Sequence, residues 1–174
     1  MSMKIEKTTI PDVLILTPKI FGDERGFFLE SYNQNTLESA GIKMEFVQDN
    51  HSRSSKGVIR GLHFQKKKPQ GKLVRCIQGE ILDVVVDIRF DSPTFGSVLT
   101  VKLNQENKKQ VLLPPGFAHG FSVLSDTAEL LYKVTDFYNP QDEAGIRWDD
   151  PGLAIEWPIE DPILSDRDQE LPFR

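Results

Sequence analysis

Residues 57–89 of this chain, GVIRGLHFQKKKPQGKLVRCIQGEILDVVVDIR, decide its fold class. Short apolar runs rich in valine, isoleucine and leucine alternate here with polar turns, at the loop 66–71 and at the tripeptide 78–80. Each turn contains a glycine, and the first also contains a proline, a residue that central strands exclude. Apolar runs of this length between such turns indicate antiparallel β-strands.

The flanking sequence continues this pattern in both directions. One helix is expected at 33–40, ending at Gly41, whereas residues 46–52 begin apolar and then become a polar run. Eleven prolines, twelve glycines and almost no helix point to an all-β fold, an antiparallel barrel or a double-sheet jelly roll. Further short strands are expected at 13–16, 27–32, 98–103, 111–113 and 128–138.

Length and composition limit the class of protein. The 174 residues are expected to form one domain, 1–174, with an N-terminal arm and an irregular C-terminal wrap from 145 to 174. A hydrophobic content of 39% with 27% charged residues describes a soluble globular chain. The net charge of -5 disfavours a general nucleic-acid binder, although a local cluster of arginine and lysine can still bind an anionic ligand.

The sequence predicts a cytoplasmic protein that does not interact with a membrane. Its N-terminus lacks the apolar core of a signal peptide, and no apolar run approaches the length of a transmembrane helix. The single cysteine, Cys76, excludes an internal disulfide and fits a reducing compartment. Its apolar neighbours predict a buried strand position and not a reactive thiol.

The segment RGLHFQ places Arg60 and His63 on an otherwise apolar strand. Side chains alternate along a strand, so two residues three apart face opposite sides unless a bulge intervenes at Gly61. Two polar side chains on such a strand favour a functional role. The alternative is a buried histidine whose ring is satisfied by a backbone carbonyl.

Metal chemistry finds no support in the spacing of the histidines. His51, His63 and His119 stand far apart, with no H-x-H pair and no H-E-x-x-H helix. A three-histidine site assembled in space stays open as an alternative, but the sequence predicts no metal. No G-x-G-x-x-G fingerprint of a dinucleotide cofactor is present either.

Other polar residues each allow a functional and a structural interpretation. Positive groups where a strand meets a turn suit phosphate oxygens, or are solvated surface charges. The polar run at 48–50 suits a base or sugar edge, or an Asx turn. In PPGFAHGF (114–121) a histidine among small residues indicates close approach by a ligand, or core packing. Tyr132 alternates with apolar neighbours as a core tyrosine does, and Asp168 completes a Ser-x-x-Asp capping box.

Taken together, these segments resemble one family, the dTDP-4-dehydrorhamnose 3,5-epimerases of the cupin-like jelly-roll class. The resemblance runs from about residue 21 to residue 168. It is carried by DERGFFLESY (23–32), FVQDNHS (46–52), GVIRGLHFQ (57–65), QGKLVR (70–75), DVVVDIRFDSPTFG (83–96), PPGFAHGF (114–121), ELLYKVTDFYNP (129–140) and WDDPGLAIEWP (148–158).

The resemblance implies a homodimer of antiparallel jelly-roll (cupin-like) barrels with short peripheral helices, acting without a metal or other cofactor on a dTDP-linked 4-keto-6-deoxyhexose. It implies that His63 is the general base, with Asp168 as its dyad partner. Tyr132 is then the acid on the opposite face, and Lys72 holds the enolate oxygen. Arg167 stands where the family often has lysine. The implied substrate-binding residues are Arg25, Glu30, Gln48, Asp49, Asn50, Arg60, His119, Tyr138, Glu143 and Arg167.

Elementary chemistry supports this allocation. A ketone at C4 acidifies the hydrogens on C3 and C5, because either carbanion delocalises onto the same oxygen. An imidazole with an ordinary pKa near ~6.5 is a suitable base, and a carboxylate behind it fixes its tautomer. The expected activity is therefore the 3,5-epimerase reaction of dTDP-L-rhamnose biosynthesis. A single-centre epimerase and a non-catalytic nucleotide-sugar-binding cupin are the alternatives.

Overall fold

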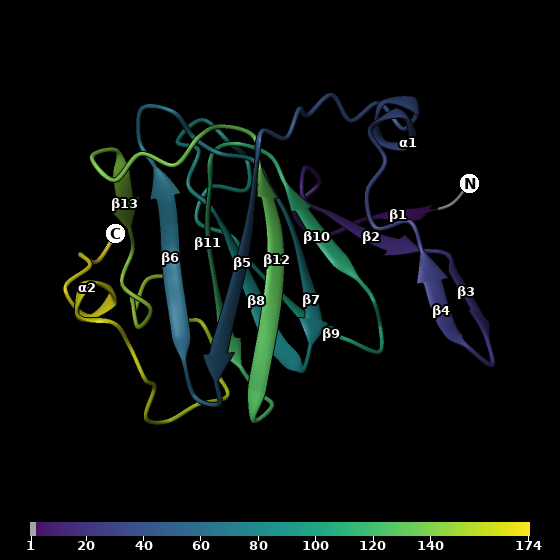
Figure 1. Ribbon diagram of the computed structural model, residues 1–174. Coiled ribbons are helices and arrows are strands. Elements are labelled where there is room, and N and C mark those ends of the chain that lie inside the picture. Colours follow the sequence, from purple (N-terminus) through teal and green to yellow (C-terminus); the bar gives the residue numbers. More distant parts are fainter. Residues whose placement is uncertain (1–2) are drawn as a thin grey trace.

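The computed structural model describes residues 3–174, which form two antiparallel β-sheets and a separate two-stranded hairpin (Figure 1). One sheet has the strand order β1-β2-β10-β7-β12-β5, the other has the order β13-β6-β11-β8-β9, and β3 pairs with β4. The elements are β1 (Met3–Lys7), β2 (Leu14–Pro18), β3 (Ile20–Asp23), β4 (Gly26–Leu29), α1 (Gln34–Ser39), β5 (Gln48–Ser55), β6 (Ile59–Gln65), β7 (Lys72–Gln78), β8 (Glu80–Asp87), β9 (Val98–Asn104), β10 (Gln110–Leu113), β11 (Phe117–Val123), β12 (Thr127–Val134), β13 (Glu143–Gly145) and α2 (Asp166–Gln169).

The main core fills the space between the two sheets. Its side chains come from both, because each strand directs alternate residues inward. On β8, Val85 faces this core while Val84 and Val86 face the other side of the sheet. The all-β antiparallel fold predicted from the sequence is confirmed, with helix confined to the two short segments α1 and α2.

Irregular segments cover the outer faces of both sheets. The C-terminal wrap packs Ile146, Leu153 and Trp157 against the outer side of the five-stranded sheet. The segment around α1 packs Leu37 and Phe46 against the outer side of the six-stranded sheet. These covers leave the space between the sheets as the region where a ligand can enter the barrel.

A bulge in β6 settles the register question raised by RGLHFQ. His119 pairs with His63, and Phe121 pairs with Arg60. Between these two pairs β6 therefore contains one more residue than β11. Gly61 occupies the bulge with φ 110°. A Cβ there would lie 2.6 Å from both the Cα of Gly120 and the carbonyl oxygen of His119. The extra residue lets both polar side chains of the motif face the barrel interior.

The sequence predicted the helix at 33–40 correctly but missed β5. Asn33 caps α1, Ala40 follows its last residue, and Gly41 has φ 81°, as expected for a helix end. Residues 48–55 form a full strand although they are polar, because they pair along their whole length with β12, and the inward side chains of Gln48 and Asn50 line a polar cavity. None of the helices within residues 3–174 is long and apolar enough to cross a membrane.

Candidate active site

A cavity of about 320 Å³ opens into the barrel between the two sheets. Both sheets supply its walls: β5, β7 and β12 from one side, and β6 and β13 from the other. Its polar lining contrasts with the apolar core farther inside the barrel. The lining residues are Gln48, Asn50, His63, Phe64, Gln65, Gln70, Lys72, Tyr132, Tyr138 and Glu143.

His63 and Asp168 form a partly buried hydrogen-bonded pair. The Nε2 atom of His63 lies 2.5 Å from Oδ1 of Asp168, the buried carboxylate of α2. Although burial opposes it, the hydrogen bond and charge of His63 hold the pKa of Asp168 below its usual value. An ionised carboxylate only accepts hydrogen bonds, so Nε2 carries the proton. The other ring nitrogen, Nδ1, is therefore the atom that can accept a proton.

The position of Asp168 also satisfies the capping prediction. Ser165 is the N-cap of α2, and its Oγ accepts a hydrogen bond from the backbone N–H of Asp168 at 3.1 Å. The Ser165 half of the predicted capping box is therefore formed, while the Asp168 carboxylate contacts His63. The cap fixes the first turn of α2, and that turn directs the carboxylate toward His63.

Lys72 is a buried lysine on β7. Its Nζ donates to the backbone carbonyl of His63 at 3.4 Å, across the space between the sheets. Burial lowers the pKa of Lys72 to about 8, while the carboxylates of Asp83 and Glu143 oppose the decrease. Near neutral pH the group is therefore an ammonium held in a poorly hydrated place, which suits an oxygen that develops negative charge.

Tyr132 reaches the cavity from the sheet that faces His63. On β12 it pairs with Asn50 of β5 and Val74 of β7, in the row next to Gln48 and Lys72. Burial raises the pKa of the Tyr132 phenol, an effect that the positive charge of Arg60 partly offsets. The phenol therefore stays protonated at neutral pH and can act as an acid.

The mouth of the cavity carries a connected group of polar side chains. The hydroxyl of Tyr138 donates a hydrogen bond to Oε2 of Glu143, and Nη1 of Arg167 donates to the same oxygen. The bond to Glu143 raises the pKa of Tyr138. Arg167 precedes Asp168 on α2, so one short helix supplies both a partner for the base and a positive charge at the mouth.

Arg60 is exposed on β6, whereas His119 is buried on β11. The Nε atom of Arg60 donates to Oγ of Ser54 on β5 at 2.9 Å, so its side chain crosses from one sheet to the other. His119 is the cross-strand neighbour of His63, and its Nε2 lies 2.7 Å from Oδ1 of Asp83. Both predicted residues are therefore close to the walls of the cavity.

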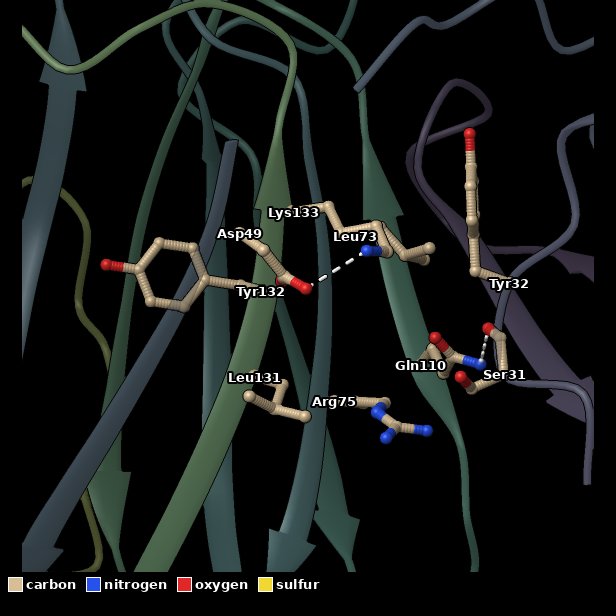
Figure 2. A pocket seen from close by; sticks show the side chains of 9 residues that line it. All are labelled: Ser31, Tyr32, Asp49, Leu73, Arg75, Gln110, Leu131, Tyr132 and Lys133. Atoms are coloured by element: carbon tan, nitrogen blue, oxygen red, sulfur yellow. Dashed lines mark hydrogen bonds and ion pairs between the residues drawn. The ribbon is translucent and has the colours of Figure 1, made fainter. Parts of the chain in front are cut away.

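Asp49, one of the predicted substrate-binding residues, has its side chain outside the cavity of its own chain. Side chains alternate along β5, so Asp49 points outward between the inward-facing Gln48 and Asn50. It pairs with Nζ of Lys133 at 3.1 Å. Figure 2 shows this pair beside a small outer pocket, with the phenol of Tyr132 directed away from it. The sequence-based prediction for the Asp49 side chain is not supported by its position.

Arg25 and Glu30 also lie away from the cavity. Arg25 sits at the tip of the β3–β4 hairpin, with its side chain 86% exposed and paired with Asp23 at 2.5 Å. Glu30 follows β4 and accepts a hydrogen bond from Nδ2 of Asn33 at 3.0 Å. The hairpin projects from the barrel in Figure 1, so neither residue reaches the cavity of its own chain.

The structure adds cavity residues that the sequence reasoning did not select. Gln65 and Gln70 line the cavity and hold its rim, since Oε1 of Gln65 accepts from the N–H of Asn139 at 2.7 Å. Nε2 of Gln70 donates to the carbonyl of Asp136 at 2.7 Å. Asp83 was detectable as a carboxylate inside the apolar run ILDVVV. Its contact with His119 could not be predicted, because the two residues are far apart in the sequence.

The three histidines do not converge on a shared site. His51 lies on the outer face of β5, where Nε2 contacts Oε2 of Glu129 at 2.9 Å. His63 and His119 are neighbours, but each is directed to a carboxylate of its own. Within residues 3–174 no group of three or more histidine, cysteine, aspartate or glutamate side chains is arranged to hold a metal ion.

Comparisons with known proteins agree on one family. Residues 7–174 match the family model described as dTDP-4-dehydrorhamnose 3,5-epimerase. A relative of that name from Shigella flexneri is 60% identical over 168 residues, 95% of this chain and 93% of the relative.

Solved structures give the same result. The dTDP-4-dehydrorhamnose 3,5-epimerase of Bacillus anthracis, with TDP and pyrophosphate bound, has a TM-score of 0.97 and 49% identity, covering 99% of both chains. The 3,5-epimerase of Legionella pneumophila, in complex with dTDP-4-keto-L-rhamnose, has a TM-score of 0.95 and 51% identity, covering 98% of this chain and 92% of that one.

Proposed function

This chain belongs to the dTDP-4-dehydrorhamnose 3,5-epimerase family, and we propose that it converts dTDP-4-dehydro-6-deoxy-D-glucose to dTDP-4-dehydro-L-rhamnose in dTDP-L-rhamnose biosynthesis. It is accordingly an enzyme of the isomerase class. The observation that carries the mechanism is the placement of His63 and Tyr132 on opposite walls of one cavity. Inversion of a carbon centre requires a base on one face and an acid on the other.

The reaction begins at His63. With Nε2 donating to Asp168, the neutral imidazole uses Nδ1 to take the proton from the carbon next to the C4 ketone. The electron pair of the broken C–H bond forms a C=C bond to C4, the C=O electron pair moves onto the oxygen, and the ketone becomes an enolate. Asp168 stabilises the imidazolium that forms, because its carboxylate is ionised and already hydrogen-bonded to the ring.

Lys72 stabilises the enolate oxygen. The ammonium is buried, and its one hydrogen bond is long, so it can turn toward a stronger acceptor. A donor placed in advance at a developing oxyanion contributes about 3–4 kcal/mol in other enzymes. Deprotonation at C3 and at C5 places charge on the same oxygen, so a single lysine serves both centres.

Tyr132 then returns a proton from the opposite side. The enolate carbon takes the phenolic hydrogen on the face away from His63, and the configuration inverts. Exchange of protons with water restores the phenol and the neutral imidazole before the second centre reacts. No oxidation or reduction occurs, because the substrate and the product are isomers.

The remaining predicted residues are proposed as ligands of the nucleotide and the sugar. Arg60 and Arg167 supply positive charge for the diphosphate. In the structure Arg167 is hydrogen-bonded to Glu143, and a phosphate of the substrate would take the place of Glu143 as the partner of Arg167. Gln48, Asn50 and His119 offer hydrogen bonds to the sugar or the base, and Tyr138 offers an aromatic face. We also propose that the enzyme works in the cytoplasm.

A second copy of the chain completes this proposal. Arg25 and Glu30 lie on or beside a hairpin that leaves the barrel, where Phe21, Phe27 and Phe28 are 51%, 60% and 70% exposed. Two-stranded hairpins are marginal alone, and clustered aromatic side chains on a surface indicate an interaction site. In the homodimer that we propose, the hairpin of one copy carries Arg25 and Glu30 to the cavity of the other.

The test is incubation of the enzyme with dTDP-4-dehydro-6-deoxy-D-glucose in heavy water. The proposal predicts deuterium at both C3 and C5, read by NMR, together with the L-rhamno product. Label at one carbon only would show a single-centre epimerase instead. Nucleotide binding without any label would show a binding protein and contradict catalysis.

A further inference from the structure

Asp83 is a buried carboxylate that the proposed mechanism does not use. It lies on β8, is fully buried, and contacts Nε2 of His119 through Oδ1 at 2.7 Å. Its other oxygen, Oδ2, is buried and has no hydrogen-bond partner among residues 3–174. An ionised carboxylate in such a place is costly unless a positive charge lies nearby.

Lys72 is a buried cation whose charged form Asp83 favours. Its ammonium contacts the carbonyl of His63, His63 pairs across the strands with His119, and His119 bonds to Asp83. Asp83 is also the strongest of the negative charges that oppose the effect of burial on the lysine. The two buried groups of opposite sign therefore belong to one contact chain that runs from β7 through β6 and β11 to β8.

We infer that Asp83 is a positioning residue of the proposed epimerase: its carboxylate keeps Lys72 in the ammonium form and fixes the ring of His119. This inference rests on the function proposed above, in which Lys72 holds the enolate oxygen. A neutral lysine amine could not stabilise that oxygen by charge. Asp83 itself touches no reacting atom in this scheme and acts through its two neighbours.

Other titratable groups around Lys72 do not replace this effect. Glu143 also favours the charged lysine, but Glu143 is already bonded to Tyr138 and Arg167 at the mouth. The groups in the cavity walls around Lys72 are His63 with Asp168 behind it, Asp83, His119, Tyr132, Tyr138 and Glu143.

The first measurement uses the enzyme without substrate. Protein labelled with ¹³C at the lysine ε-carbons is titrated by NMR, with the Lys72 signal assigned from Lys72→Arg. Lys72 of the wild type is expected to titrate near pH 8, since burial lowers its pKa to about 8. In Asp83→Asn the midpoint is expected to fall by about one pH unit or more, because an opposite charge is lost. An unchanged midpoint would overturn the inference.

Matched variants separate this effect from damage to the fold. Asp83→Glu keeps the charge and should keep the midpoint near that of the wild type. Asp12→Asn removes one carboxylate on the surface, where it pairs with Arg89, and should leave Lys72 unchanged. If Asp83→Asn does not fold, Asp83→Ser gives the same test at the same position. The midpoint of Lys72 must again be lower than in the wild type, and no difference would contradict the proposal.

The second measurement is the pH profile of kcat/KM for epimerisation. On the alkaline side the wild type should lose activity as Lys72 loses its proton. In Asp83→Asn this loss should occur at lower pH, so a midpoint lower by one pH unit makes the ratio of wild-type to variant activity rise about fivefold from pH 6 to pH 8. A uniform loss at every pH would indicate a structural role only. The NMR result stands even if no epimerase activity is found, so the two hypotheses fail separately.

Discussion

At the scale of single residues, Asp168 decides which nitrogen of His63 can act as a base. Its carboxylate occupies Nε2, so Nδ1 is the free acceptor. The same aspartate is fixed by the Ser165 cap of α2, which ties the ring of His63 to the C-terminal wrap. The tautomer of His63 therefore depends on the C-terminal wrap, a segment whose only regular element is the short helix α2.

Asp168→Asn should lower the epimerisation rate about 10²–10⁴-fold, the range by which general base catalysis contributes. The amide keeps the size of the side chain, but it cannot stabilise the imidazolium and can turn the histidine to the wrong tautomer. The measurement is kcat together with the affinity for dTDP by calorimetry. Asp166→Asn, on the same helix, is the control. Equal loss of nucleotide affinity and rate in Asp168→Asn would speak against this role.

Tyr132→Phe should separate removal of the proton from its delivery. His63 can still form the enolate, but without the phenol the proton returns from the same face. In heavy water, substrate recovered from this variant should carry deuterium with its configuration retained, while product formation falls by about 10² or more. Rapid formation of inverted product by the variant would show that another group is the acid.

At the scale of elements, the bulge in β6 is the feature that turns two strand residues into one site. The added residue at Gly61 puts Arg60 and His63 on the interior side, and the close contact with Gly120 leaves no room for a side chain. A regular strand here would direct one of the two side chains out of the barrel.

Gly61→Ala should therefore destabilise the protein by about 2 kcal/mol or more, because the new Cβ meets the backbone of β11 at 2.6 Å and φ is 110°. The control is Gly41→Ala, which has φ 81° but no atom within 4 Å of the added Cβ, and should cost only about 1 kcal/mol. Urea denaturation measures both. Similar costs for the two variants would show that the close contact in the bulge is unimportant.

At the scale of the whole molecule, one chain builds a base, an acid and an oxyanion donor, but leaves predicted ligand residues outside its own cavity. His63, Lys72 and Tyr132 converge because two sheets face each other. Arg25 instead sits on an exposed aromatic hairpin. The proposed homodimer resolves this difference without any change in the fold of the chain.

Sedimentation should show a dimer that weakens when Phe27 and Phe28 are both replaced by serine. Burial of one phenylalanine contributes about 1.5–3 kcal/mol, so the dissociation constant should rise at least about tenfold. Phe90→Ser, at a still more exposed position away from the hairpin, should leave the dimer intact. A wild-type protein that is monomeric at micromolar concentration would contradict the proposal.

The donated residue can be tested directly by complementation. Arg25→Ala and His63→Ala are each expected to have low activity, and mixed dimers should regain it. In the mixed dimer, the chain with intact His63 receives Arg25 from the other copy, which gives one complete site. If Arg25 acts on its own chain, or not at all in the site, mixing will restore nothing.

The sequence by itself determined the fold class and the helix at 33–40, and it supplied the candidates for the site. Alternation and turn chemistry are local, so they can be seen in the sequence, and His63, Lys72 and Tyr132 of the family motifs line one cavity. The strand β5 escaped detection because strand prediction relies on apolar inward positions. In β5 these positions are polar, and two of them, Gln48 and Asn50, line the cavity.

Only the tertiary structure decided which side chains meet. It placed Asp49 on the outer face, Arg25 and Glu30 on the hairpin, and Asp83 against His119. Each of these outcomes depends on register between strands that are distant in the sequence, and a shift of one residue reverses the face of every side chain. The sequence therefore fixed which chemical groups are available, while the pairing of the strands fixed which of them share a site.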